Sequence, residues 1–210
     1  MKDVHRSAAI GFDRAADVYE RARPGYPDAA VDWLIDHLHA DGLVVDLAAG
    51  TGKMTRALVA RGLDVVAVEP VERMRRRLSE ALPGARALDG TAEAMPFEDG
   101  DAAAVVVAQA FHWFRHAEAL EEIHAWQPPF DESDLIRPAG VFKATYAQPM
   151  TAESFLDRFN SCSFIAILDD ASKAEVIGKL RDLVERHPDL AGKGDFVQPY
   201  VTEVYLYEAV

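Results

Sequence analysis

The chain has 210 residues, half of them hydrophobic, a net charge of −13 and a pI near 4.9. Its length and apolar content allow one good core, so we expect one domain. The acidic balance argues against nucleic acid, which is bound by clustered Lys and Arg, and against an anionic membrane surface. The single cysteine, Cys162, excludes an internal disulfide. No apolar run approaches the ~20 residues of a membrane span, and no signal peptide is visible. We therefore expect a cytoplasmic protein.

The first 42 residues predict two helices separated by a turn. Residues 7–21 place Phe12 and Tyr19 on one helical face. Residues 23–27, with two prolines and a glycine, interrupt this pattern, and a second helix is expected to begin at Asp28.

The next segment, residues 43–59, reads as a strand, a glycine loop and a helix. The strand closes with Asp46, the loop contains Gly50 and Gly52, and the helix carries Met54, Leu58 and Val59 on one face. Glycines allow a sharp turn and a ligand against the backbone, and the helix offers free N–H groups to an anionic part of that ligand. The glycine and Lys spacing does not fit a phosphate-binding P-loop, and no third glycine completes a dinucleotide fingerprint.

The following strand, residues 65–68, leads directly into Glu69, which lies 23 positions after Asp46. An acid at about this distance from a glycine loop binds the hydroxyls of a ribose. A plain tight turn that happens to be followed by an acid is the alternative interpretation. Asp46 is placed to meet a cationic group of the same ligand.

Strands and helices continue to alternate downstream. A helix over 71–82 should bury Met74 and Leu78, and strands are predicted over 86–88 and 102–107. Helices are expected over 116–125 and 171–187, the latter with Val176, Leu180, Leu183 and Val184 facing inward, and a late antiparallel strand over 200–207.

Four segments taken together resemble the successive motifs of class I methyltransferases that use S-adenosylmethionine (SAM). They are Asp-Leu-Ala-Ala-Gly-Thr-Gly at 46–52, Val-Glu-Pro at 68–70 followed by Met74, Gly-Thr-Ala-Glu-Ala-Met-Pro-Phe at 90–97, and Ala-Gln-Ala-Phe-His-Trp-Phe at 108–114. Within this family, the chain resembles the small-molecule enzymes grouped with trans-aconitate methyltransferase. The resemblance is dense from about Phe12 to Ala125 and returns from about Gly140 to the end.

The resemblance implies an α/β fold, Rossmann-like and doubly wound, with a mostly parallel sheet, a late antiparallel strand and an N-terminal helical lid. It divides a single domain, residues 1–210, into a lid (1–42), a cofactor-binding core (43–125) and a divergent or shortened C-terminal part (126–210). The implied cofactor contacts are Tyr19, Arg23, Asp46, Ala48, Gly50, Gly52, Glu69, Pro70, Met74, Ala92, Glu93 and Gln109. Relatives often carry an Asp where Thr91 stands, so Ala92 and Glu93 would have to hold the adenine here.

The implied reaction moves the methyl group of SAM to a small-molecule acceptor and leaves S-adenosylhomocysteine, with no metal. Tyr26 and Trp113 are the implied acceptor contacts, and Tyr19 and Arg23 lie in the same lid segment. His112 could remove a proton from the acceptor, or could simply cap the next helix. A SAM-binding regulatory or partner-binding protein without an acceptor pocket is the alternative function.

The resemblance breaks after Ala125. Residues 136–146 could be a divergent fifth strand, yet residues 142–164 also resemble a later strand and helix of the family. We favour the second interpretation, with a block of residues missing between about Trp126 and Arg137. The block is either deleted from the protein or absent only from the sequence as printed. A deletion would remove the fifth strand and part of the acceptor pocket, which is the feature that supports the non-catalytic alternative.

Overall fold

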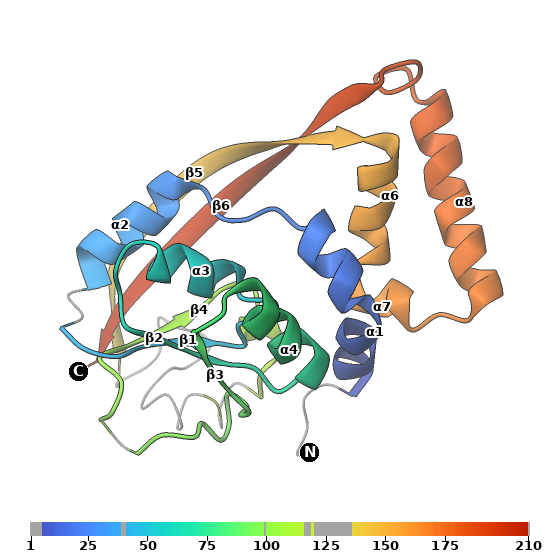
Figure 1. Cartoon of the computed structure of the whole chain (residues 1–210). Helices are drawn as coiled ribbons and strands as arrows, with labels where there is room; N and C mark the ends of the chain where they lie inside the picture. Colours follow the sequence, from blue (N-terminus) through green and yellow to red (C-terminus); the bar gives the residue numbers. More distant parts are fainter. Residues whose placement is uncertain (1–5, 39–40, 99, 116–118, 120–135, 210) are drawn as a thin grey trace. The chain divides into compact units, whose positions relative to one another are not determined.

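A computed structural model describes the chain apart from residues 1–5, 39–40, 99, 116–118, 120–135 and 210 (Figure 1). The chain divides into two compact units. The first comprises Met1–Val4, Gly25–Ala144 and Val201–Val210, and the second His5–Pro24 and Thr145–Tyr200. The predicted lid is thereby divided, because α1 (Arg6–Ala22) belongs to the second unit and α2 (Asp28–Leu38) to the first.

The first unit contains a four-stranded sheet in the order β3-β2-β1-β4. Every neighbouring pair is parallel, with Leu47 opposite Val68 on one side and Val107 on the other. The chain builds outward from β1 to β3 and then returns to the other side of β1, so the switch point lies between β1 and β4. Open α/β sheets bind their ligands at the carboxyl ends of the strands next to such a point. The strands are β1 (Val44–Leu47), β2 (Val65–Val68), β3 (Arg86–Leu88) and β4 (Ala104–Val107).

Both faces of this sheet are covered, which explains its continuous apolar strands. Val44 packs on one face with residues of α2 and α3 (Lys53–Val59), including Leu34 and Leu58. Val45 and Leu47 pack on the other face with residues that include Ala92. The sequence-based assignment of Val59 to the buried face was wrong, because its side chain is 37% exposed; Met54 and Leu58 already supply the contacts of this short helix.

Two long strands, β5 (Ile136–Thr151) and β6 (Asp195–Ala209), form a separate two-stranded sheet. They run antiparallel (Figure 1), which confirms the predicted late antiparallel strand. Side chains alternate between a covered and an exposed face along both strands, as expected for a sheet with one solvated side. Within the described residues, 136–146 pairs with β6 and is not a fifth strand of the parallel sheet, which agrees with the second interpretation. The missing block stays a prediction. The predicted helix 116–125 lies almost wholly outside the described residues.

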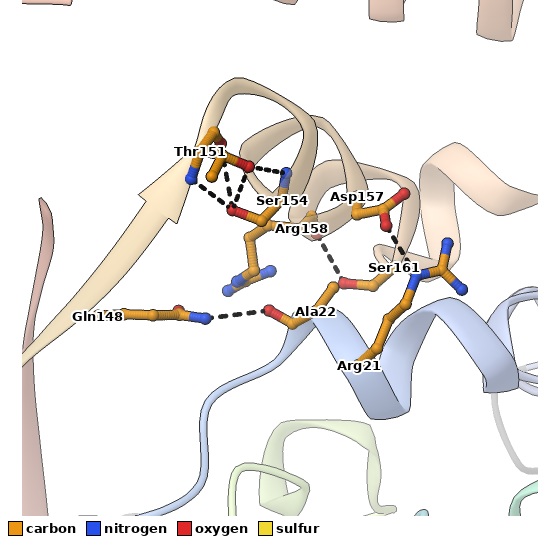
Figure 2. Close-up of polar contacts among 8 residues, drawn as sticks. All are labelled: Arg21, Ala22, Gln148, Thr151, Ser154, Asp157, Arg158 and Ser161. Atoms are coloured by element: carbon orange, nitrogen blue, oxygen red, sulfur yellow. Dashed lines mark hydrogen bonds and ion pairs between the residues drawn. The ribbon is translucent and has the colours of Figure 1, made fainter. Parts of the chain in front are cut away.

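The second unit contains helices and one end of the β5–β6 sheet. Thr151 begins α6 (Ala152–Asn160) with a capping box, in which its side chain and that of Ser154 each accept a bond from the other's backbone N–H (Figure 2). Asp169 caps α8 (Asp170–Arg186) in a similar way through the amide of Ser172. Met150, Phe155 and Val184 form the small core. Leu183 was expected to be buried but is 44% exposed, because only a narrow stripe of α8 meets α6.

Candidate active site

Asp46 is fully buried at the end of β1. Its Oδ2 accepts a 2.5 Å hydrogen bond from the Thr55 hydroxyl, whereas its Oδ1 is buried and meets no donor among the described residues. Burial raises the pKa of Asp46 from 3.8 to about 7, and the Thr55 bond only partly opposes this. A carboxylate held in this way is costly until a donor or cation reaches it.

Glu69 lies one residue beyond β2 and is 5% exposed. Its Oε2 accepts a 2.8 Å bond from the amide of Gly50, and its Oε1 accepts one of equal length from the amide of Val71. Burial raises its pKa from 4.5 to about 7, against the effect of these two bonds, and the Asp46 charge adds a little to the rise. The two acids proposed from sequence therefore lie at neighbouring strand ends, and both resist ionisation in the free protein.

Two non-glycine residues near the site have left-handed backbones. Ala48, just after β1, and Gln109, just after β4, each have φ of 56°. An L-residue in this region costs of the order of 1–3 kcal/mol, and such strain clusters at ligand sites. Both positions are predicted cofactor contacts, and both lie next to the switch point of the sheet.

The two glycines of the loop differ in what a side chain at each position would meet. Both have positive φ, 59° at Gly50 and 82° at Gly52. A Cβ on Gly50 would meet nothing within 4 Å, whereas a Cβ on Gly52 would lie 2.6 Å from Cγ of Leu78 in α4 (Glu72–Ala81). Gly50 thus leaves open space beside the loop, and Gly52 is required for packing against α4.

The loop over 90–97 is held by a small bridge between Thr91 and Ala94. Ala92 is buried in the sheet core. Oε1 of Glu93 accepts a 2.8 Å bond from the amide of Arg115, which ties this loop to the segment after β4. Its carboxylate is thus already engaged, and contact with an adenine stays a prediction.

The segment after β4 forms a short 3₁₀ helix, η1 (Phe111–Trp113). His112 is exposed and its ring lies 4.8 Å from that of Trp113, which is half-buried. Exposure leaves the imidazole accessible to a small molecule. Among the other predicted contacts, Met74 is buried in α4 and Pro70 is half-buried beside Glu69.

The lid residues lie in different surroundings. Tyr26, in the first unit, packs against the core formed by Val31, Leu34 and their neighbours. Tyr19 and Arg23 belong to the second unit, where the Arg23 guanidinium lies 5.1 Å from the centre of the Tyr19 ring. That these three residues touch cofactor or acceptor stays a prediction.

The carboxyl ends of β1, β2 and β4 offer features that fit SAM. They are the buried carboxyl group of Glu69, the Oδ1 of Asp46 that has no partner among the described residues, and the open space at Gly50. That Glu69 meets a ribose diol and Asp46 an ammonium stays a prediction. Sequence reasoning did not assign Thr55, which orients Asp46, or Thr51, whose buried hydroxyl has no partner among the described residues. A hydroxyl on the first turn of the helix after the loop was the available signal for Thr55.

Comparison with known proteins agrees with this site. Residues 45–128 match the family described as "Methyltransferase domain". Uncharacterized methyltransferases of Mycobacterium tuberculosis and Mycobacterium bovis are 34% identical over 237 positions, covering 96% of this chain and 97% of theirs. A methyltransferase-like protein of Schizosaccharomyces pombe is 36% identical over 121 residues, covering 56% of this chain and 47% of its own. The chain belongs to the class I SAM-dependent methyltransferase family.

Solved structures show the same fold. A structure named as a type II methyltransferase from Anaeromyxobacter dehalogenans superposes with a TM-score of 0.63 at 17% identity, covering 89% of this chain and 97% of that one. One from Bacillus halodurans C-125, also named as a methyltransferase, gives 0.54 at 15%, covering 86% and 98%. The predicted Rossmann-like fold is confirmed.

The mycobacterial match also bears on the missing block. It runs over 237 positions although this chain has only 210 residues, so the relatives carry residues that have no counterpart here.

In the part of the chain that the structure describes, no helix has the length and hydropathy of a membrane span. The same part contains no group of three or more acids, histidines or cysteines arranged for a metal.

Proposed function

We propose that the chain transfers the methyl group of SAM to a small-molecule acceptor, with residues 1–210 acting as one methyltransferase domain. The observation that carries the proposal is the pair of buried acids, Asp46 and Glu69, at neighbouring ends of parallel strands and joined through the Gly50 loop. When bound, SAM supplies a sulfonium methyl group that is already activated for transfer.

The residues of the first unit would act mainly by binding and orientation. Glu69 would accept bonds from the ribose hydroxyls, and Asp46 would face the ammonium of the methionine part. Gly50 would let the backbone lie against that part, and Gln109, Ala92 and Glu93 would line the rest of the cofactor site. Alignment of two reactants can account for ~7–11 kcal/mol of a barrier.

His112 and Trp113 would meet the acceptor. The exposed imidazole of His112 could take a proton from a hydroxyl or amine as the methyl group arrives. Trp113 offers an aromatic face, which attracts a cationic sulfonium.

The test is calorimetry with S-adenosylhomocysteine, followed by a turnover screen. We expect micromolar binding that NADH does not compete with, and absence of heat at high protein concentration would refute the assignment. The screen measures S-adenosylhomocysteine formed from SAM with small carboxylates, phenols and amines as acceptors.

The non-catalytic alternative is less well supported, since the relatives and the structures reported above are all named methyltransferases. The residues that this chain lacks relative to the mycobacterial proteins are the observation in its favour. Tight cofactor binding without turnover on any acceptor, together with turnover by a mycobacterial relative in the same screen, would support it.

A further inference from the structure

Arg75, in α4, joins the ends of two strands of the first unit. Its Nη1 donates a hydrogen bond of 2.5 Å to the backbone carbonyl of Glu69, just after β2, and another of 3.1 Å to Oδ1 of Asp89, just after β3. The amide of Glu69 in turn donates to the carbonyl of Leu88 in β3 at 3.0 Å. A single guanidinium therefore helps to fix the backbone that carries the Glu69 carboxyl group.

The same helix also holds the side chain of Glu69. Val71, the residue that begins α4, donates its amide to Oε1 of Glu69 at 2.8 Å. Its carbonyl accepts a 3.0 Å bond from the amide of Arg75, about one helical turn later. Glu69 is thus held at its carboxyl group by the start of α4 and at its carbonyl by the Arg75 side chain. A helix N-terminus and a cation both favour the ionised form of a carboxyl group beside them.

The next residue along α4, Arg76, provides a contrast. Arg76 pairs with Glu72 within the helix at 3.4 Å, and the two side chains are 63% and 78% exposed. The side chain of Arg75 is only 20% exposed, so solvent screens its charge much less. Its acidic partner, Asp89, is 73% exposed, and an ion pair with so exposed a group is weak.

The charge of Arg75 acts on a carboxyl group that burial makes hard to ionise. Burial raises the pKa of Glu69 from 4.5 to about 7; two backbone amides and then the charge of Arg75 oppose this rise, and the charge of Asp46 adds to it. For Asp46 itself, the opposing groups are the hydroxyl and the backbone of Thr55, which are uncharged. Arg75 therefore distinguishes the two buried acids, because it favours ionisation of Glu69.

We propose that Arg75 is a positioning residue for cofactor binding, which holds the proposed ribose-binding acid, Glu69, in place and supplies a positive charge beside it. Arg75 acts through Glu69, and no contact between its own side chain and the ligand is required. Its charge keeps more of Glu69 in the carboxylate form, which a ribose diol needs as an acceptor. The inference rests on the proposed function, because the ribose belongs to the cofactor.

The first test titrates Glu69 in the ligand-free protein. The side-chain carboxyl carbons of glutamate are labelled with carbon-13, and the NMR signal of Glu69 is identified by its absence in Glu69→Gln. We expect Arg75→Gln to raise the titration midpoint of Glu69 by at least about 0.5 pH unit, and Arg75→Lys, which keeps the charge, to show a smaller shift. Arg76→Gln removes the same charge from the next residue and should leave the midpoint unchanged.

Asp89→Asn separates an effect of charge from one of structure. Loss of the Asp89 carboxylate leaves Arg75 less neutralised, so Glu69 should titrate at a lower pH than in the wild type. If the bridge between the strand ends only holds the structure, Asp89→Asn and Arg75→Gln should move the midpoint in the same direction or not at all. That result overturns the proposal, as does an equal shift in Arg76→Gln.

The second test measures the affinity for S-adenosylhomocysteine by calorimetry below and above pH 7. Arg75→Gln should bind about threefold more weakly than the wild type at the lower pH, as a midpoint shift of about 0.5 unit requires, and should recover at the higher pH. A loss of affinity that is the same at every pH indicates a structural role and overturns the proposal. If the wild type binds no S-adenosylhomocysteine while Glu69 shifts as expected, the proposed function is what fails.

Discussion

The backbone amide of Gly50 donates a 2.8 Å hydrogen bond to Oε2 of Glu69. This bond joins the loop after β1 to the end of β2, so the proposed ribose-binding acid also fixes the loop against which the ligand would lie. A ribose hydroxyl that bonds to Glu69 would therefore share the carboxylate with the Gly50 amide, which already donates to it in the free protein.

Glu69→Ala should weaken S-adenosylhomocysteine binding more than Glu93→Ala. The first change removes a charged acceptor for two hydroxyls, worth ~1.5–3 kcal/mol, and leaves the amides of the half-buried Gly50 and the buried Val71 without their acceptor. The second removes one bond to the Arg115 amide and one adenine contact that backbone groups can replace. Calorimetry on both variants checks this, and equal losses would show that the ribose is misplaced.

Gly50→Ala and Gly52→Ala should separate binding from folding. The added Cβ at Gly50 enters open space, so the protein should stay folded with a loss of ~1–2 kcal/mol from the positive φ and lose cofactor affinity. At Gly52 it meets Leu78, so the loss of stability should be larger. Urea unfolding and equilibrium dialysis with labelled SAM measure the two effects.

Gly50→Val should abolish binding altogether, and a folded Gly50→Val protein with normal affinity would mean that the loop is only a tight turn.

Asp46 should make the ligand-free protein less stable as the pH rises from about 4 to 7. Its folded pKa of about 7 lies above the unfolded value near 4, so the folded chain holds the extra proton in this range. Asp46→Asn should gain on the wild type by up to about 1.4 kcal/mol per pH unit between those limits, and the difference should level off above pH 7. Denaturant unfolding at several pH values measures it. Asp36→Asn, at an exposed acid, is the matched control.

Binding of S-adenosylhomocysteine should tighten as the pH rises toward 7. Burial leaves Glu69 partly protonated near neutrality, and a ribose diol needs the carboxylate as acceptor. Below pH 7 the affinity should rise by up to about tenfold per pH unit for each proton released. Calorimetry in buffers of different ionisation enthalpy counts these protons. Glu69→Gln should show a shallower dependence, and an unchanged slope would assign the effect to another group.

Gly11→Ala should destabilise the second unit. The added Cβ would lie 2.3 Å from the backbone oxygen of Ser163 in α7 (Ser163–Ala166), which cannot move as a side chain could. We expect a loss of ~1–3 kcal/mol in the free energy of unfolding. Gly178→Ala, in the interior of α8 with nothing within 4 Å, should instead gain ~0.5–1 kcal/mol. If both variants change alike, the α1–α7 contact is not as close as described.

The sequence was informative where a pattern is local. Apolar runs located β1, β2 and β4, because a strand covered on both faces needs continuous apolar residues. The third strand, β3, was predicted over the residues that form it. The apolar run at 65–68 predicted that Glu69 follows a strand, which the structure confirms, whereas the ribose-binding role inferred from its spacing after Asp46 stays a prediction. Val59 and Leu183 were misassigned because helical periodicity gives the direction of a face, not the width of what covers it.

The remaining features depend on contacts between distant parts of the chain. The close approach of Leu78 to Gly52, and that of Ser163 to Gly11, come from helix packing, which no local sequence pattern encodes. Arg23 at the end of α1 and Arg158 of α6 both contact Sγ of Cys162, which requires the two helices to lie together in the folded second unit. The positive φ of Ala48 and Gln109 is equally unexpected, since neither residue type favours it.

Ala48 and Gln109 have a consequence for engineering. A library selected for heat resistance alone should accumulate glycine or asparagine at both positions, since either residue accepts φ near 56° with less strain. Such variants would be more stable to heat, but the strand ends that flank the switch point would be less rigid and methyl transfer would be slower. Gains in stability at a ligand site commonly lower activity in this way. Selection for turnover should keep the two residues as they are.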